Sequence, residues 1–83
     1  MKKLDYRLLG NKIKQIRQEK GVSRKELAEK IGVADDKTVG RIETGRRRVK
    51  ITELILLCYH LDVNPDDLIE GTFSETEDKT INR

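Results

Sequence analysis

Four glycine residues divide this chain into short segments, and each segment carries apolar residues at helical spacing. The glycines are Gly21, Gly32, Gly45 and Gly71. Within the segments apolar side chains recur three and four residues apart, as along one face of an α-helix. A glycine directly after such a segment favours a helix end, because glycine adopts the left-handed conformation without steric cost. With one proline in 83 residues, the chain is predicted to be all-α, a compact bundle of five short helices.

Residues that can cap a helix stand at the beginning of these segments. A Ser, Asp or Asn side chain in this position accepts a hydrogen bond from an amide that the first helical turn leaves without a partner. The candidate caps are Asp5, Ser23, Asp35 and Asn64. For the third helix Asp36 can serve in place of Asp35, and both choices stay open. A fourth helix is expected over about residues 51–61.

The predicted domain is small and its apolar content is limited. Eighty-three residues suffice for one domain, which we place at residues 1–71. Residues 72–83 are polar and patternless apart from Phe73 and Ile81, and we expect a mobile C-terminal tail there. Only 35% of the residues are hydrophobic and tryptophan is absent. So few apolar residues are not enough to line a sizeable catalytic or ligand-binding pocket.

The sequence lacks the residue patterns of an enzyme. It contains no nucleophile–base set and no glycine-rich phosphate loop, and His60 has no metal-ligand partners at suitable spacing. We therefore expect no enzyme, no metal, no cofactor and no small-molecule ligand. No apolar run of about 18 residues is present, so no membrane association is expected. The single cysteine, Cys58, cannot form an intramolecular disulfide, which indicates a cytoplasmic protein.

Charge is distributed very unevenly along the chain. Residues 1–50 hold 16 Lys and Arg against 7 Asp and Glu, a net charge of +9, whereas residues 51–83 carry a net charge of −6. A positive region of this strength attracts polyanions such as nucleic acid. A solvated basic face without a partner explains the charge equally well, so the charge alone does not decide between them.

Residues 21–45 have the layout of a helix-turn-helix unit. A short capped helix is followed by a tight turn at Gly32-Val33 and by a second short helix. In such a unit the second helix enters the major groove of DNA, where polar side chains contact base edges. The outer face of this helix offers Asp36, Lys37, Thr38, Gly40 and Arg41. An ordinary surface helix would have the same periodicity.

The stretch GVSRKELAEKIGV followed by TVGRIETG resembles the phage-repressor and Cro-like helix-turn-helix family, also called the xenobiotic-response-element type. The resemblance extends over about residues 7–71 and includes the opening LGNKIKQIRQEKG and the closing LDVNPDDLIEG. It implies a five-helix, lambda-repressor-like DNA-binding domain with helices 2 and 3 as the helix-turn-helix. It also implies a bacterial or phage transcription regulator that acts on the nucleoid.

The resemblance assigns roles to individual residues. Four match or adjoin positions that contact bases: Asp36, Lys37, Thr38 and Arg41. Four match or follow positions that hold DNA phosphates: Arg24, Arg46, Arg47 and Arg48. Arg17 and Glu43 match a buried ion pair that joins helix 1 to the end of helix 3 in some members. The chemistry agrees, because Arg and Lys suit guanine, Asp suits cytosine and the arginine fork suits phosphate.

The chain departs from the family pattern in two places. The turn over residues 32–36 is one residue longer than usual. If Asp36 is the cap of the third helix it is no longer a base contact, so both roles of Asp36 stay open. Gly40 lies within the same helix, where glycine costs about 1 kcal/mol relative to alanine. It either lets the helix lie close to DNA or is simply tolerated.

The predicted fourth helix is more apolar than one buried face requires. Its i, i+3, i+4, i+7 set is expected to fill the core, with Ile51 and Ile55 beside it: Leu54, Leu57, Cys58 and Leu61. Leu56 and Tyr59 lie on a different side and, with Phe73, are predicted to form a homodimer interface. The alternative is that helix 5 and the tail cover this side within one chain.

Together these features give a functional hypothesis and a competitor. We expect a repressor whose homodimer contacts two half-sites of an operator in double-stranded DNA. The competing hypothesis is a protein-interaction module, for example an antitoxin-like domain that binds a partner protein. Sequence-dependent and strongly salt-dependent DNA binding distinguishes the first from the second.

Overall fold

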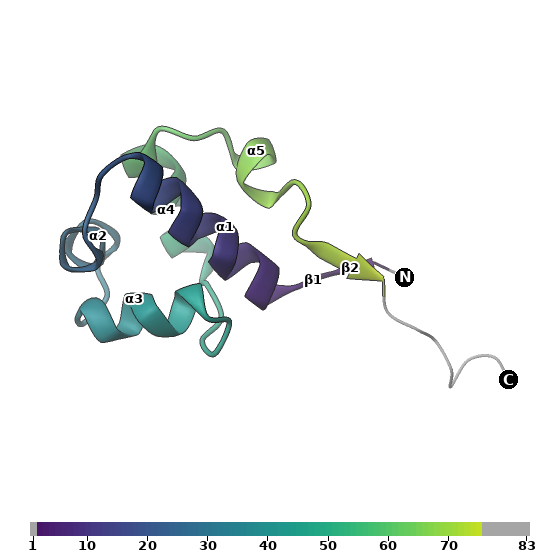
Figure 1. The fold of residues 1–83 in the computed structure, drawn as a ribbon, viewed down its shortest axis with the longest axis horizontal. Coiled ribbons are helices and arrows are strands. Elements are labelled where there is room, and N and C mark those ends of the chain that lie inside the picture. The colour runs from purple at the N-terminus through teal and green to yellow at the C-terminus, as the bar shows by residue number, and fades with distance from the viewer. Residues whose placement is uncertain (1, 76–83) are drawn as a thin grey trace, which may run out of the picture.

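The computed structural model describes residues 2–75 and contains five helices and two short strands. The helices are α1 (Tyr6–Glu19), α2 (Arg24–Ile31), α3 (Asp36–Glu43), α4 (Ile51–Leu61) and α5 (Pro65–Ile69). The strands are β1 (Lys2–Leu4) and β2 (Phe73–Glu75). Figure 1 shows the helices gathered into one bundle, from which the strands project at the end where α1 begins. The prediction of a compact five-helix domain is confirmed.

Four of the five helices in residues 2–75 begin at candidate caps, whereas α4 follows Lys50. Asp5 accepts hydrogen bonds from the amides of Arg7 and Leu8, and Ser23 from that of Glu26. Asn64 accepts from the amide of Asp66 at the start of α5. In the third helix Asp35, rather than Asp36, is the cap: its Oδ1 accepts from the Thr38 amide at 2.9 Å. Asp36 is therefore the first residue of α3.

One hydrophobic core joins all five helices. Its members lie on the inward faces of the helices and are almost completely buried, among them Leu9, Ile13, Leu27, Ile42, Leu57 and Leu68. α3 packs against both α1 and α2. Its apolar residues Val39 and Ile42 each have about 1% of their surface exposed. The inward side of α3 is therefore fixed by the core, and the opposite side faces solvent.

Two glycines allow α1 to lie close to the end of α3. A Cβ atom on Gly10 would lie 2.3 Å from the carbonyl oxygen of Ile42, too close for any side chain. Gly45, two residues after the end of α3, has φ +79°, and a Cβ there would lie 2.7 Å from the Cα of Arg7. The beginning of α1 is therefore held against the last turn of α3.

The two strands differ from the expected all-helical chain and C-terminal tail. Residues 73–75 pair antiparallel with residues 2–4, with Leu4 opposite Phe73. The Asp5 amide donates to the carbonyl of Thr72 at 2.7 Å, and Thr72 is buried. α1 and α5 are in contact, which brings the ends of the domain together, and three-residue strands are too short to show an alternating pattern. The rest of the expected tail, residues 76–83, lies outside the described residues.

Candidate nucleic-acid interface

α2, the turn after it and α3 form the predicted helix-turn-helix unit. α2 turns its apolar residues Leu27, Ala28 and Ile31 inward, and Gly32 ends it in the left-handed conformation with φ 76°. The Val33 amide then donates to the carbonyl of Ala28 at 3.1 Å. This hydrogen bond closes the turn, and α3 packs against α1 and α2.

The solvent-facing side of α3 is polar. Asp36, Lys37 and Arg41 are exposed there, and Gly40 adds no side chain between them. Lys37 and Arg41 are one turn apart, so their side chains extend from the same side of the helix. Two cations and one carboxylate therefore stand on the face that the core leaves free.

Thr38 does not belong to this face, which corrects its predicted base contact. Only 9% of the residue is exposed, and its hydroxyl donates to Asp35 Oδ1 at 2.9 Å. The hydrogen bonds from the amide and hydroxyl of Thr38 lower the pKa of Asp35. Thr38 therefore completes the N-terminal cap of α3 instead of facing outward.

Glu43, at the end of α3, holds three helices together. Its side chain has no exposed surface, and its Oε2 accepts from Arg17 Nε at 2.6 Å. Its Oε1 accepts from Arg24 Nε at 3.0 Å. Arg17 also donates to the carbonyl of Val22 at 2.9 Å. The geometry joins the two predicted partners, and it adds Arg24, whose bond to Glu43 the sequence did not indicate.

The arginines of the α3–α4 loop have three different environments. Arg47 donates from Nη1 and Nη2 to the two carboxylate oxygens of Glu53, at 2.8 and 2.9 Å. Arg46 is exposed. Arg48 is exposed as well, and its Cζ lies 5.6 Å from the centre of the Tyr6 ring. A run of three basic residues therefore does not present three equivalent charges.

The bond to Glu53 argues against the predicted phosphate contact of Arg47, which stays a prediction to be tested. Glu53 is buried at the start of α4, and it also accepts from the Lys50 amide at 3.0 Å. Hydrogen bonds from Arg47 lower the pKa of Glu53, and the same bonds raise the pKa of Arg47. Both terminal nitrogens of Arg47 are engaged within the protein, so this side chain fixes the loop to α4.

Arg7 is a basic residue near α3 that the sequence analysis did not single out. It is exposed in the first turn of α1, and its backbone lies against Gly45 at the end of α3. The loop arginines follow directly after that glycine. In the sequence, Gly45 is the one indication that another segment lies close to the end of α3. A single glycine does not show that this segment is the one around Arg7.

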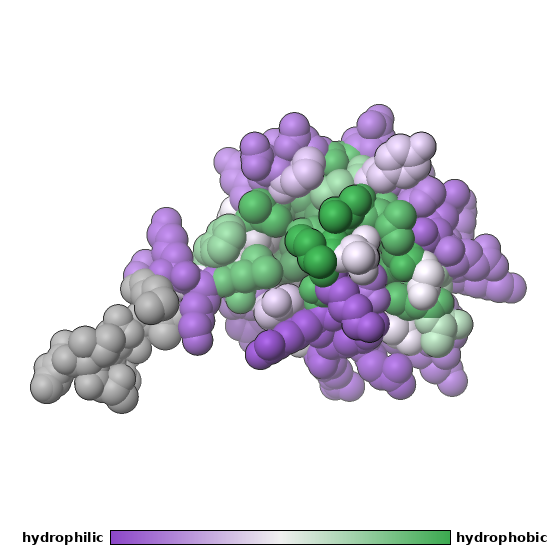
Figure 2. All heavy atoms as spheres, turned by 180° about the vertical axis from the view of Figure 1, so that it is seen from behind, coloured by the Kyte–Doolittle hydropathy of each residue, from purple (hydrophilic) through white to green (hydrophobic). Residues whose placement is uncertain are grey.

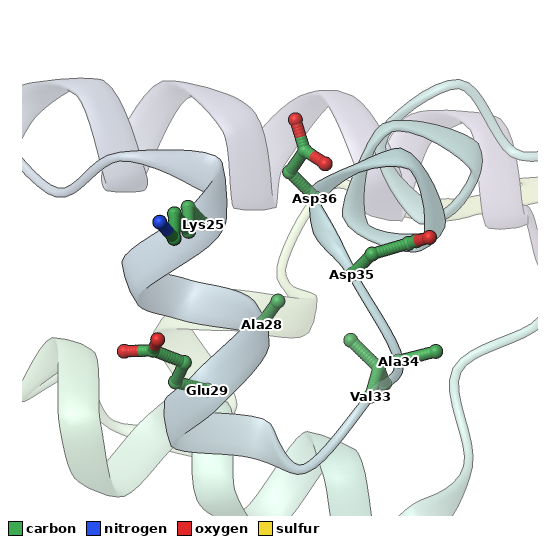
Figure 3. A pocket seen from close by; sticks show the side chains of 7 residues that line it. All are labelled: Lys25, Ala28, Glu29, Val33, Ala34, Asp35 and Asp36. Carbon is green, nitrogen blue, oxygen red and sulfur yellow. The ribbon is translucent and has the colours of Figure 1, made fainter.

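A hollow of about 380 Å³ lies between α2 and the turn that follows it. Figure 3 shows its lining of small apolar and charged side chains: Lys25, Ala28, Glu29, Val33, Ala34, Asp35 and Asp36. The longer turn and the two alanines leave this space open. Within residues 2–75 no group of His, Cys, Asp and Glu side chains could hold a metal ion.

α4 carries an exposed apolar face, and its composition differs in part from the expectation. Leu56 and Tyr59 are exposed, but so are Ile51 and Ile55, which were expected beside the core. Leu57, Cys58 and Leu61 are buried as expected and Leu54 is partly buried, whereas Glu53 is buried although it was not expected in the core. Ile51, Ile55 and Tyr59 follow each other every four residues and form one stripe. We call Ile51, Ile55, Leu56 and Tyr59 the α4 face; Phe73, on β2, is exposed as well.

The α4 face lies on the side of the molecule away from the viewer in Figure 1. Figure 2 shows hydrophobic side chains gathered on this side and bordered by hydrophilic ones. Cys58 belongs to the core instead, where burial raises the pKa of its thiol. No helix within residues 2–75 is long and apolar enough to cross a membrane.

Comparison with known proteins places the chain among transcription regulators. A family described as helix-turn-helix matches residues 13–68. No curated protein sequence matches the chain. Among solved structures, the restriction-modification controller protein C.AhdI from Aeromonas hydrophila is 33% identical with a TM-score of 0.70, and the match covers 77% of this chain and 96% of that one.

Two further structures are similar over most of the chain. The biofilm master regulator SinR, solved in complex with DNA, is 40% identical with a TM-score of 0.66, and the match covers 75% of this chain and 98% of that one. The clp gene regulator ClgR from Corynebacterium glutamicum is 30% identical with a TM-score of 0.73, covering 80% of this chain and 69% of that one. The predicted family resemblance is confirmed.

Proposed function

The chain belongs to the helix-turn-helix family of phage-repressor and Cro-like DNA-binding transcription regulators, and we propose that it acts as a homodimeric repressor that contacts two half-sites of an operator through α3. The observation that carries the proposal is the polar outer side of α3. It combines Lys37 and Arg41 with Asp36, at the N-terminus of the helix, on the face opposite the core.

These three side chains have the chemistry that base edges require. The major groove admits an α-helix, and there Lys37 and Arg41 can donate to O6 and N7 of guanine. The carboxylate of Asp36 can accept from N4 of cytosine. Asp36 is free for this role because Asp35 caps the helix. The proposed sequence preference therefore depends on these three residues.

The exposed arginines beside α3 supply the proposed contacts to phosphates. Arg46 and Arg48 follow the end of α3 and are exposed, and Arg7 extends from the turn of α1 that lies against Gly45. A phosphate contact adds affinity for every sequence and releases counterions, so binding weakens steeply with salt. These residues position the protein, while α3 determines the sequence.

The α4 face supports the proposed dimer. An exposed apolar stripe of this kind on a small domain is typical of an interface, and tyrosine is enriched there. A two-fold dimer would place two α3 helices on half-sites about one DNA turn apart, roughly 34–36 Å. Bound across a promoter, such a dimer would exclude RNA polymerase, which is the proposed basis of repression.

Selection from a library of random duplex DNA tests the proposal. We expect the enriched sequences to contain two inverted half-sites with centres about 10–10.5 base pairs apart. The variant Arg41→Ala should enrich a more relaxed motif, because a guanine contact contributes about 1–3 kcal/mol of discrimination. A protein that enriches no sequence, or only one isolated half-site, would contradict the proposal.

The exposed α4 face also fits a second candidate function, an antitoxin-like domain that binds a partner protein of another kind. Sedimentation of the free protein and of its DNA complex separates the candidates. The dimer proposal expects two copies per operator in the parent and separation of copies in the double variant Leu56→Glu with Tyr59→Glu. Gln18→Glu, an exposed change on α1, is the control and should keep the dimer. A parent that stays monomeric on its operator would favour the second candidate.

A further inference from the structure

Arg24 occupies an unusual position for a residue that begins α2. Its side chain crosses to α3, where Nε donates to Glu43 Oε1 at 3.0 Å. The carboxylate of Glu43 is completely buried, whereas 42% of the Arg24 side chain is exposed. The guanidinium is thus held from its inner side by a buried acid and faces solvent with its outer side.

Gly40 provides the surface against which this guanidinium lies. A Cβ atom on Gly40 would lie 3.6 Å from Arg24 Nη1 and 3.8 Å from its Cζ. No other group comes within 4 Å of that point, with the neighbouring residues and the backbone of α3 left aside. Gly40 stands between Lys37 and Arg41 on the outer side of α3. The guanidinium of Arg24 therefore lies where position 40 has no side chain of its own.

The outer nitrogens of Arg24 are free to bind another group. Among residues 2–75 the hydrogen bond from Nε to Glu43 is the one that Arg24 makes with its side chain. Nη1 and Nη2 keep all their N–H groups. A guanidinium presents these donors in a fixed plane that matches two acceptors on one partner. The guanidinium of Arg24 is thus already oriented before DNA binds.

We propose that Arg24 is a base-contacting residue of the recognition surface, with guanine as the base and Glu43 as the residue that positions it. The inference rests on the proposed function, because it requires α3 to lie in the major groove. There Nη1 and Nη2 would donate to O6 and N7 of a guanine beside those contacted from Lys37 and Arg41. The family resemblance implies only a phosphate contact for Arg24, which would weaken all sequences alike when lost.

The substitution Arg24→Lys separates the two roles. Lysine keeps the positive charge but carries its three N–H donors on a single nitrogen, so an ammonium bonded to Glu43 cannot present two planar donors to O6 and N7 of one guanine. The native arginine uses Nε to bind Glu43 and keeps both terminal nitrogens as donors to a base. Binding is measured on the sequence enriched by the parent and on duplexes with one base pair changed, at two salt concentrations. We expect the preference for one G·C pair per half-site to fall by about 10- to 100-fold, with other positions and the salt dependence unchanged.

Two controls accompany this variant. Arg46→Lys changes an exposed loop arginine in the same way and should keep every base preference. Gly40→Ala should also keep them, because 3.6 Å is an ordinary contact distance for its new methyl group. Circular dichroism establishes that each variant is folded, as expected for Arg24→Lys because Glu43 keeps its bonds to Arg17.

The outcome of the binding series decides the proposal. An Arg24→Lys protein that keeps the parent's preference at every base pair would overturn it, whether or not overall affinity falls. If instead the parent itself enriches no sequence, the proposed function fails before Arg24 is tested. The two failures are therefore distinguishable.

Discussion

Two buried glutamates hold the molecule together, and they differ in what surrounds them. Glu43 is bonded to Arg17 and Arg24 and joins α1, α2 and α3. Glu53 is bonded to Arg47 and to the amide of Lys50, and it joins the basic loop to α4. The first fixes α3, the helix that is proposed to contact DNA. The second fixes the loop between that helix and the α4 face.

The comparison shows that arginines of similar appearance in the sequence have different structural environments. Arg17 and Arg47 neutralise buried carboxylates, whereas Arg41 and Arg46 remain exposed. Burying a carboxylate without a partner is costly. The internal bonds are therefore expected to persist when DNA binds, and the exposed arginines are the ones available to it.

The largest effect is expected at Glu43. Glu43→Ala leaves the buried guanidinium of Arg17 without a countercharge and should lower the free energy of unfolding by about 3–5 kcal/mol. Urea denaturation followed by circular dichroism measures it. Glu26→Ala, at an exposed glutamate of α2, is the control, and a Glu43→Ala midpoint equal to this control would show that the three-helix network contributes little.

A smaller effect is expected at Arg47. Arg47→Ala leaves Glu53 with the Lys50 amide as its remaining partner, and we expect a loss of about 1–3 kcal/mol of stability. Because both nitrogens are engaged internally, the logarithmic salt dependence of DNA binding should stay unchanged. Arg46→Ala should show the reverse, with unchanged stability and a slope lower by about one unit. A lower salt slope for Arg47→Ala would show that Arg47 contacts a DNA phosphate.

The smallest effect concerns the pH dependence of Glu53. Since the folded-state pKa of Glu53 is lowered, its contribution is complete above the unfolded-state pKa, about 4.3, and is lost as the pH falls through the folded-state value. Asp35 also has a lowered pKa, so the parent is compared with Glu53→Gln. The difference in urea midpoint between the two should shrink from pH 6 to pH 3. A constant difference would contradict this account of Glu53.

The helices and their caps could be predicted because their signals are local. Asp5, Ser23, Asp35 and Asn64 act within three residues of their own positions, and a glycine ends a helix through its own conformation. The pair of Arg17 and Glu43 was found through the family resemblance. Local pattern and resemblance together therefore located the helix-turn-helix unit and its outer face.

The remaining features depend on contacts between segments. Arg47 and Glu53 are six residues apart across a loop, which matches no helical spacing. In α4 both sides are apolar, so periodicity placed Leu57 in the core but could not tell that Glu53 is buried while Ile51 and Ile55 face solvent. Thr38 was placed on the outer face beside Lys37, and only the packing of α3 shows that it is buried and bonded to the cap residue Asp35.

The most direct test of the central claim compares Arg41→Ala with Arg46→Ala on the enriched operator and on unrelated duplex DNA. If α3 contacts bases and the loop contacts phosphates, Arg41→Ala should lose about 1–3 kcal/mol of binding to the operator and much less on unrelated DNA. Arg46→Ala should weaken binding to both duplexes by the same factor. If Arg41→Ala also weakens both equally, or keeps full affinity for the operator, α3 is not the element that recognises the sequence.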